Sequence, residues 1–176
     1  MAFDTVRHSS LLEKLAQLDM PDNVYNWMVD FYSGRSHCTR FRGEISALHD
    51  VTASIIQGSS LGPAAYVANA ADLKCITLGN EMVKFADDSN VIIPAVNSSS
   101  RQSEIRHVEE WASRNNLKVN PAKYQEIIFV DKRRKISSQP PSALPDIERV
   151  TSVKILGVTL TNSLSVAEHV NKTITR

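Results

Sequence analysis

This chain has few of the residues that commit a protein to disulfide or zinc chemistry. Its 2 cysteines, Cys38 and Cys75, lie far apart and show no paired spacing, so they predict neither a disulfide framework nor a zinc motif. Its 5 histidines are scattered, with no HExxH pattern and no cluster. Metal binding through histidine is therefore not expected.

Long apolar runs are also missing. The sequence has no signal-peptide pattern and no apolar stretch of about eighteen residues, the length that a membrane-spanning helix requires. We therefore expect an intracellular protein, nuclear or cytoplasmic, with no membrane partner.

The chain also has no large excess of charge of either sign. The chain has 176 residues and a formal net charge of +1, with 42% hydrophobic and 22% charged residues, which is typical of one globular domain with a substantial core rather than a disordered chain. A near-neutral balance argues against a dominant nucleic-acid surface. The one dense basic run, residues 132–135 (KRRK), fits either a solvated loop or a nucleic-acid contact.

The most informative feature that is present is a pair of acids, Asp87 and Asp88, between two apolar segments, residues 82–85 and 91–93. The pattern predicts a tight β-hairpin with both acids at its turn. Adjacent carboxylates repel each other unless a cation neutralises them, and Mg²⁺ prefers carboxylate oxygens combined with water and substrate phosphate. A magnesium site and an ordinary solvated turn are both open interpretations.

A second signal lies about thirty residues upstream, where a glycine turn precedes a predicted helix. Gly58 can adopt backbone angles that are closed to other residues, Ser59 or Ser60 can cap the helix, and Pro63 suits its first turn. Free amides at the start of a helix favour phosphate. A phosphate-facing turn and an ordinary helix start are both open at this point.

Together these segments resemble the reverse transcriptases of non-LTR (LINE-type) retrotransposons. The resemblance covers nearly the whole chain, and five segments carry it in the family's order. Four are similar to successive palm motifs and one to the primer grip: residues 2–8 (AFDTVRH), 57–63 (QGSSLGP), 85–88 (FADD), 111–123 (WASRNNLKVNPAK) and 153–158 (VKILGV).

The resemblance implies an α+β reverse-transcriptase palm, an antiparallel sheet backed by helices on one face, with the acid hairpin at its centre. Residues 1–150 would form the palm, from the end of the first motif, and residues 151–176 the primer-grip hairpin and the start of the thumb. The implied activity is that of an RNA-directed DNA polymerase, with an RNA template, a DNA primer, dNTPs and Mg²⁺.

The resemblance also implies roles for single residues. Asp87 and Asp88 would hold the catalytic metal ions, with Asp87 the more direct ligand. Four further residues would contact substrate: Phe3 as the bulky gate beneath the incoming sugar, Gln57 and Gly58 along the template and the nascent base pair, and Lys123 near the pyrophosphate leaving group.

One departure from the family pattern concerns the third metal carboxylate. In the family an Asp, followed by variable residues, precedes Ala-Phe-Asp, whereas this sequence begins Met1-Ala2-Phe3-Asp4. Asp4 matches the later, usually non-catalytic Asp. We therefore expect an N-terminally truncated palm that lacks the fingers and most of the thumb and is inactive alone. The alternative is a non-catalytic nucleic-acid-binding remnant of a retrotransposon.

Local patterns predict the remaining elements. They are a helix opened by a capping box at residues 10–13, a helix from Asp22 that stops at Gly34, a hairpin turning at residues 42–44, a helix from about 100 to 115, strands at 117–119 and 124–130, a surface loop at 131–147, a hairpin around Gly157, and a helix opened by residues 165–168.

Overall fold

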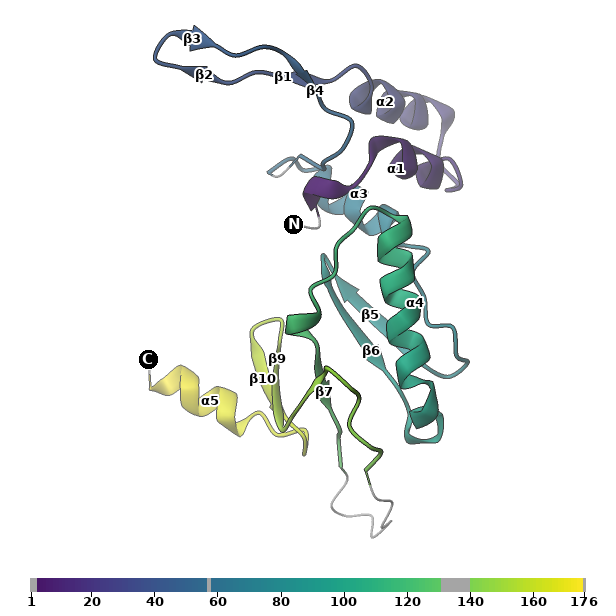
Figure 1. The fold of residues 1–176 in the computed structure, drawn as a ribbon, viewed down its shortest axis with the longest axis vertical. Helices are drawn as coiled ribbons and strands as arrows, with labels where there is room; N and C mark the ends of the chain where they lie inside the picture. The colour runs from purple at the N-terminus through teal and green to yellow at the C-terminus, as the bar shows by residue number, and fades with distance from the viewer. Residues whose placement is uncertain (1–2, 57, 131–139, 176) are drawn as a thin grey trace. The chain divides into compact units, whose positions relative to one another are not determined.

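The computed structural model describes residues 3–56, 58–130 and 140–175 (Figure 1). Within them the chain has a mixed α+β fold with five α-helices and ten short strands, which pair into five two-stranded sheets. It divides into two compact units, Met1–Val119 and Asn120–Arg176. The α+β prediction is confirmed. Pairing of the strands into one larger sheet is not seen in the described part of the chain.

The first unit is built around four helices: α1 (His8–Leu15), α2 (Asp22–Tyr32), α3 (Gly62–Asn69) and α4 (Arg101–Arg114). Apolar positions at helical spacing give each helix a face that can pack against the others. Buried apolar side chains of these helices and of the segments next to them form one core, made of Val6, Leu11, Leu15, Tyr32, Ile55, Ala65, Tyr66, Ala70, Leu73, Trp111 and Ala112.

Three antiparallel strand pairs complete this unit. Strands β5 (Glu81–Phe85) and β6 (Asp88–Ile92) form the acid hairpin, β1 (Ser36–His37) pairs with β4 (His49–Asp50), and β2 (Arg40–Phe41) pairs with β3 (Glu44–Ile45). Arg42 and Gly43 join β2 to β3 with φ angles of 50° and 90°. Two positive φ values are what a tight two-residue hairpin turn requires, which confirms the predicted turn.

The second unit begins with a 3₁₀ turn, η3 (Pro121–Lys123). Strands β7 (Gln125–Ile127) and β8 (Glu148–Val150) then pair in parallel, and an ion pair between Arg149 and Glu126 links them. Strands β9 (Ser152–Ile155) and β10 (Val158–Thr161) form the predicted hairpin, which turns at Leu156 and Gly157. Helix α5 (Ala167–Ile174) follows, and its first amide bonds to the hydroxyl of Ser165.

Two local predictions are wrong. Helix α1 begins at His8, so Ser10 lies inside the helix and does not cap it. The amide of His8 instead donates to the carbonyl of Thr52, 3.0 Å away, so a distant segment supplies the partner that a cap would supply. Residues 117–119 form no strand; the side chains of Leu117 and Val119 pack against the core instead.

No helix in the described ranges is long and apolar enough to cross a membrane.

Candidate functional site

The two acids lie at the crest of the β5–β6 hairpin. Phe85 pairs with Asp88, so only Ala86 and Asp87 form the turn, and Ala86 has a φ of 50°. Asp87 is a turn residue, Asp88 is the first residue of β6, and both are exposed. Their predicted place in the hairpin is confirmed. Their carboxylate oxygens are open to solvent and can serve as ligands for a hard divalent cation.

Tyr66 of α3 links this crest to the N-terminal segment. Its ring stacks on Phe3 with centroids 4.4 Å apart and planes at 24°. Burial raises the pKa of Tyr66, and the negative charge of Asp87 raises it further. The structure thus packs Phe3, a residue predicted from sequence, against Tyr66, which sequence reasoning missed, and the charge of Asp87 acts on the Tyr66 phenol.

Lys84 ties the acid hairpin to the end of α3. Its ammonium donates to the carbonyl oxygen of Ala70 and, over 2.8 Å, to that of Leu73. Burial lowers the pKa of Lys84, as do the positive charges of Lys74 and Lys14, while Asp72 opposes the change. Strand β5, which leads directly to the acids, is therefore attached to the helix that follows the glycine turn.

A second lysine binds the same end of α3 from helix α1. Lys14 Nζ lies 2.5 Å from the carbonyl oxygen of Asn69 and 2.9 Å from Asp72 Oδ1. Trp111 Nε1 donates to the same Asp72 oxygen over 3.1 Å, and the Lys14 ammonium lies 4.8 Å from the Trp111 ring centroid. Burial acts to raise the pKa of Asp72, but the bonds from Lys14 and Trp111 outweigh it and leave this pKa lowered. Helices α1, α3 and α4 thus meet at one ionic cluster.

The segment before β5 is held by Glu104 of α4, which is fully buried. Its carboxylate accepts from the amide of Ile76 at 3.1 Å, the amide of Thr77 at 2.9 Å and Asn80 Nδ2 at 2.8 Å. Burial acts to raise the pKa of Glu104, but these hydrogen bonds outweigh it, and the pKa is lowered.

The glycine turn has the geometry that the sequence predicted. Gly58 has a φ of +83°, and Ser59 Oγ accepts from the amide of Gly62 over 3.0 Å, at the start of α3. Pro63 lies in the first turn of the helix. Gln57 lies outside the described residues.

Two other predicted contacts stay predictions. Lys123 lies in η3, where the side chain of Asn120 accepts from the amide of Ala122 over 3.2 Å, and it belongs to the second compact unit. The basic run at residues 132–135 lies outside the described ranges. Asp4 lies in the 3₁₀ turn η1 (Phe3–Thr5).

The donors suit a divalent metal only in part. Asp87 and Asp88 offer the carboxylate oxygens that Mg²⁺ prefers. Within the part of the chain that the structure describes, no group of three or more His, Cys, Asp or Glu side chains could hold a metal ion. Two carboxylates therefore need further oxygen ligands from water, substrate or another protein segment.

Comparison with known proteins gives the family. Residues 1–160 match the family described as reverse transcriptase (RNA-dependent DNA polymerase), whose members use nucleic-acid substrates and a divalent metal ion.

Three relatives from Drosophila melanogaster illustrate the match. The probable RNA-directed DNA polymerase from transposon X-element is 31% identical over 185 residues, covering 99% of this chain and 20% of its own length. The RNA-directed DNA polymerase from mobile element jockey is 28% identical, covering 96% and 19%. The probable RNA-directed DNA polymerase from transposon BS is 29% identical, covering 99% and 20%.

This chain thus spans about a fifth of the length of these curated relatives. It belongs to the reverse transcriptase family and is related to the RNA-directed DNA polymerases of non-LTR retrotransposons.

Proposed function

We propose that residues 1–176 form part of the palm of an RNA-directed DNA polymerase that copies an RNA template from a DNA primer. The observation that carries the proposal is the acid hairpin itself. Its crest exposes Asp87 and Asp88, and Asp87 lies within electrostatic range of Tyr66, which stacks on Phe3. In this proposal the acid pair supplies the metal-held charge for the phosphates of a nucleoside triphosphate, and the Phe3 ring of the stack lies beneath its sugar.

In this proposal Asp87 and Asp88 hold Mg²⁺, with Asp87 the more direct ligand. Bound metal would activate the primer hydroxyl and spread the negative charge of the in-line transition state. The protein's own part is to hold the two carboxylates in place, and Lys84 and Glu104 support this by anchoring β5 and the segment before it.

The other site residues keep the roles that the resemblance implies. Gln57 and Gly58 would lie along the template and the nascent base pair, and Lys123 would stabilise charge on the leaving pyrophosphate or supply a proton. By motif content, residues 1–150 are proposed as palm and residues 151–176 as the primer-grip hairpin and the start of the thumb.

A specific observation favours a second candidate function for the polypeptide of residues 1–176 on its own. Because no third metal-binding side chain joins the acid pair in the described residues, this polypeptide could bind nucleic acid without catalysing nucleotide addition. We therefore expect no template-dependent extension of a primer by residues 1–176 alone.

Mn²⁺ binding tests the proposal, because Mn²⁺ replaces Mg²⁺ at oxygen sites and is detected by electron paramagnetic resonance. A longer polypeptide that carries the leading Asp of the first motif should bind Mn²⁺ more tightly than residues 1–176, and Asp87→Asn should undo the gain. Asp19→Asn, an exposed change of the same charge, is the control. Affinity that Asp87→Asn leaves unchanged would show that Asp87 is not a ligand, and robust primer extension by residues 1–176 would show that two carboxylates suffice.

A further inference from the structure

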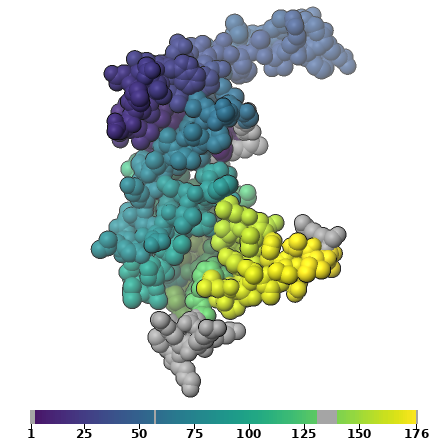
Figure 2. All heavy atoms as spheres, turned by 180° about the vertical axis from the view of Figure 1, so that it is seen from behind, coloured from purple at the N-terminus to yellow at the C-terminus, as the bar shows by residue number. Residues whose placement is uncertain are grey.

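An arm, residues 33–54, leaves the end of α2 and returns toward α3. Strands β1 and β4 pair at its base, and β2 and β3 pair at its far end (Figure 1). Every residue from 36 to 50 is exposed, and in Figure 2 this blue segment extends beyond the purple helices of its unit. An isolated two-stranded ribbon of this kind has little stability of its own. Packing within the tip therefore does not account for the presence of the arm.

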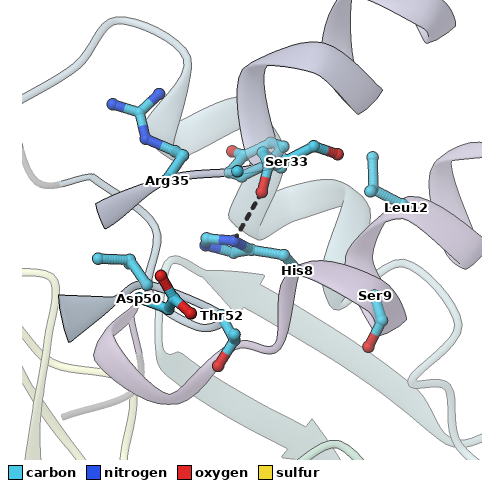
Figure 3. Close-up of a pocket in the computed structure, with 10 residues that line it drawn as sticks. His8, Ser9, Leu12, Ser33, Arg35, Asp50 and Thr52 are labelled. Carbon is cyan, nitrogen blue, oxygen red and sulfur yellow. Dashed lines mark hydrogen bonds between the residues drawn. The ribbon is translucent and has the colours of Figure 1, made fainter.

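The base of the arm is anchored by the buried His8. Its Nδ1 lies 3.1 Å from the carbonyl oxygen of Tyr32, just before the arm, and its Nε2 lies 2.8 Å from that of Ser54, at the arm's end. Figure 3 shows His8 among the residues that line a pocket of about 520 Å³ at the base of the arm. Backbone bonds from Val51 to Arg35 and from Ser54 to Val6, both 2.8 Å, close the base. The outgoing and returning segments thus leave the core from one defined point.

The outgoing strand of the arm is basic. Residues 33–43 contain three arginines, Arg35, Arg40 and Arg42, and no acidic residue. Arg35 uses part of its hydrogen-bonding capacity within the protein, because its Nη1 donates to the carbonyl of Phe31 over 2.9 Å. Arg40 pairs across the strands with Ile45, an apolar residue. Within the described ranges, neither Arg40 nor Arg42 makes an ion pair.

The tip also presents an aromatic ring. Phe41 is 68% exposed, and the guanidinium of Arg42 lies 5.2 Å from its ring centroid. An exposed aromatic ring that lies between two arginines in the sequence offers two contacts that nucleic acids accept from proteins, namely phosphate binding by guanidinium groups and stacking of a base on an aromatic face. An apolar protein partner would not call for two arginines without ion pairs, one next to the ring and one beside it in the sequence.

We propose that the arm is a nucleic-acid contact, in which Arg40 and Arg42 bind backbone phosphates and Phe41 stacks on a base. The choice of ligand rests on the proposed polymerase function; the site itself, at the tip of the arm, is separate from the acid hairpin. The returning strand carries two acids, Glu44, which pairs with Phe41, and Asp50, so the positive charge belongs to the outgoing strand and the turn.

The test uses fluorescence anisotropy of a labelled RNA strand and a labelled RNA–DNA hybrid, titrated with residues 1–176 at several salt concentrations. The double variant Arg40→Gln/Arg42→Gln should weaken binding about tenfold and reduce the salt slope by about 1 to 2, since each lost phosphate contact removes about one released counterion. Phe41→Ala should weaken binding by a similar factor without changing the slope. The matched control is Lys74→Gln/Arg106→Gln, which removes the same charge from exposed positions of the same unit.

Three results would overturn the proposal. They are no binding of either nucleic acid by residues 1–176, equal affinities for the double variant and its control, and sedimentation that shows the exposed tip joining two copies of the chain. Circular dichroism of each variant checks that the fold is retained, and none of these residues contributes to the core. A negative result for nucleic-acid binding by the arm would not change the Mn²⁺ result at Asp87. Failure of this proposal and failure of the polymerase function are therefore distinguishable.

Discussion

The ammonium of Lys84 lies 2.8 Å from the carbonyl oxygen of Leu73 and also donates to that of Ala70. A cation is favourable here because Ala70 directly follows the last residue of α3, where the carbonyl end of the helix dipole carries partial negative charge. Since Lys84 lies three residues before Asp87, this contact fixes the acid hairpin against the helix that follows the glycine turn. The position of the acids thus depends on a residue that carries no chemistry itself.

Replacement of this lysine tests the contact. Lys84→Met keeps the length and apolar body of the side chain but removes the donor, so the carbonyl groups of Ala70 and Leu73 lose the ammonium, and that of Ala70 keeps only the amide of Leu73. We expect the free energy of unfolding to fall by about 1 to 2 kcal/mol, measured by urea denaturation followed by tryptophan fluorescence. Lys74→Met is the control, because Lys74 is exposed, and it should change stability by less than about 0.5 kcal/mol. Equal effects of the two substitutions would mean that the Lys84 contact contributes nothing specific.

Glu104 gives a pH-dependent prediction. Its pKa in the folded protein is lowered, because the bonds from Ile76, Thr77 and Asn80 favour the carboxylate more than burial disfavours it. The folded state therefore holds its proton less tightly than the unfolded state, whose glutamate pKa is about 4.3. The stabilisation from Glu104 should be complete above that value and should disappear as the pH falls through the lowered folded pKa.

Glu104→Gln removes this ionisation. At pH 7 it should cost about 1 to 2 kcal/mol, because an amide offers one acceptor oxygen and places an N–H against the loop amides. As the pH falls through the lowered folded pKa of Glu104, the variant and the parent should converge in stability. Urea denaturation at a series of pH values measures both effects, and Glu110→Gln, an exposed change on the same helix, is the control. A cost that does not change as the pH is lowered from 7 into the acid range would contradict the role of the carboxylate.

The sequence predicted the elements whose signal is local. The acid hairpin and the turns at Gly43 and Gly157 follow from apolar runs that flank residues suited to tight turns, and all three are confirmed. The capping box at residues 10–13 is also a local signal, yet it failed, because the amide of His8 found a partner at Thr52. A tertiary contact can replace a cap, and no local pattern reports it.

The supporting residues of the site were missed for the same reason. Lys14 contacts Asp72, 58 positions away, and Glu104 contacts the segment around Thr77, 27 positions away. Neither side chain belongs to a motif, and their partners are largely backbone groups, which look alike in every sequence. Asp87 and Asp88 were found because two adjacent acids at a turn are conspicuous, whereas Tyr66 was one aromatic residue among several on helices.

Gly58 provides a test of the turn before α3. Its φ of +83° is strained for residues with a β-carbon, while an added Cβ would meet no atom within 4 Å. The cost of Gly58→Ala should therefore come from the backbone alone, about 1 kcal/mol, as measured by urea denaturation. Gly58→Asn should recover part of the loss, because asparagine tolerates positive φ better than alanine does. Equal stability of the alanine variant and the parent would show that the turn relaxes to another conformation.

The coupling between Asp87 and Tyr66 can be measured directly at the phenol. Burial raises the pKa of Tyr66, and the charge of Asp87 adds to that rise. Asp87→Asn removes the charge while keeping the size of the side chain, so the pKa of Tyr66 should fall but remain above 10, its ordinary value. Selective ¹³C labelling of tyrosine rings and NMR titration at alkaline pH would follow this one residue among the four tyrosines.

Asp88→Asn is the matched control for this titration, because it removes the same charge from the neighbouring acid. Only Asp87 acts on the phenol, so the pKa of Tyr66 should stay where it is in the parent. That contrast makes the test specific for orientation: it asks which of the two carboxylates faces the Tyr66–Phe3 stack. Equal shifts from both substitutions would mean that the hairpin crest presents both acids to the stack. No shift from either would mean that the crest lies away from it, and the proposed nucleotide pocket would lose its main structural support.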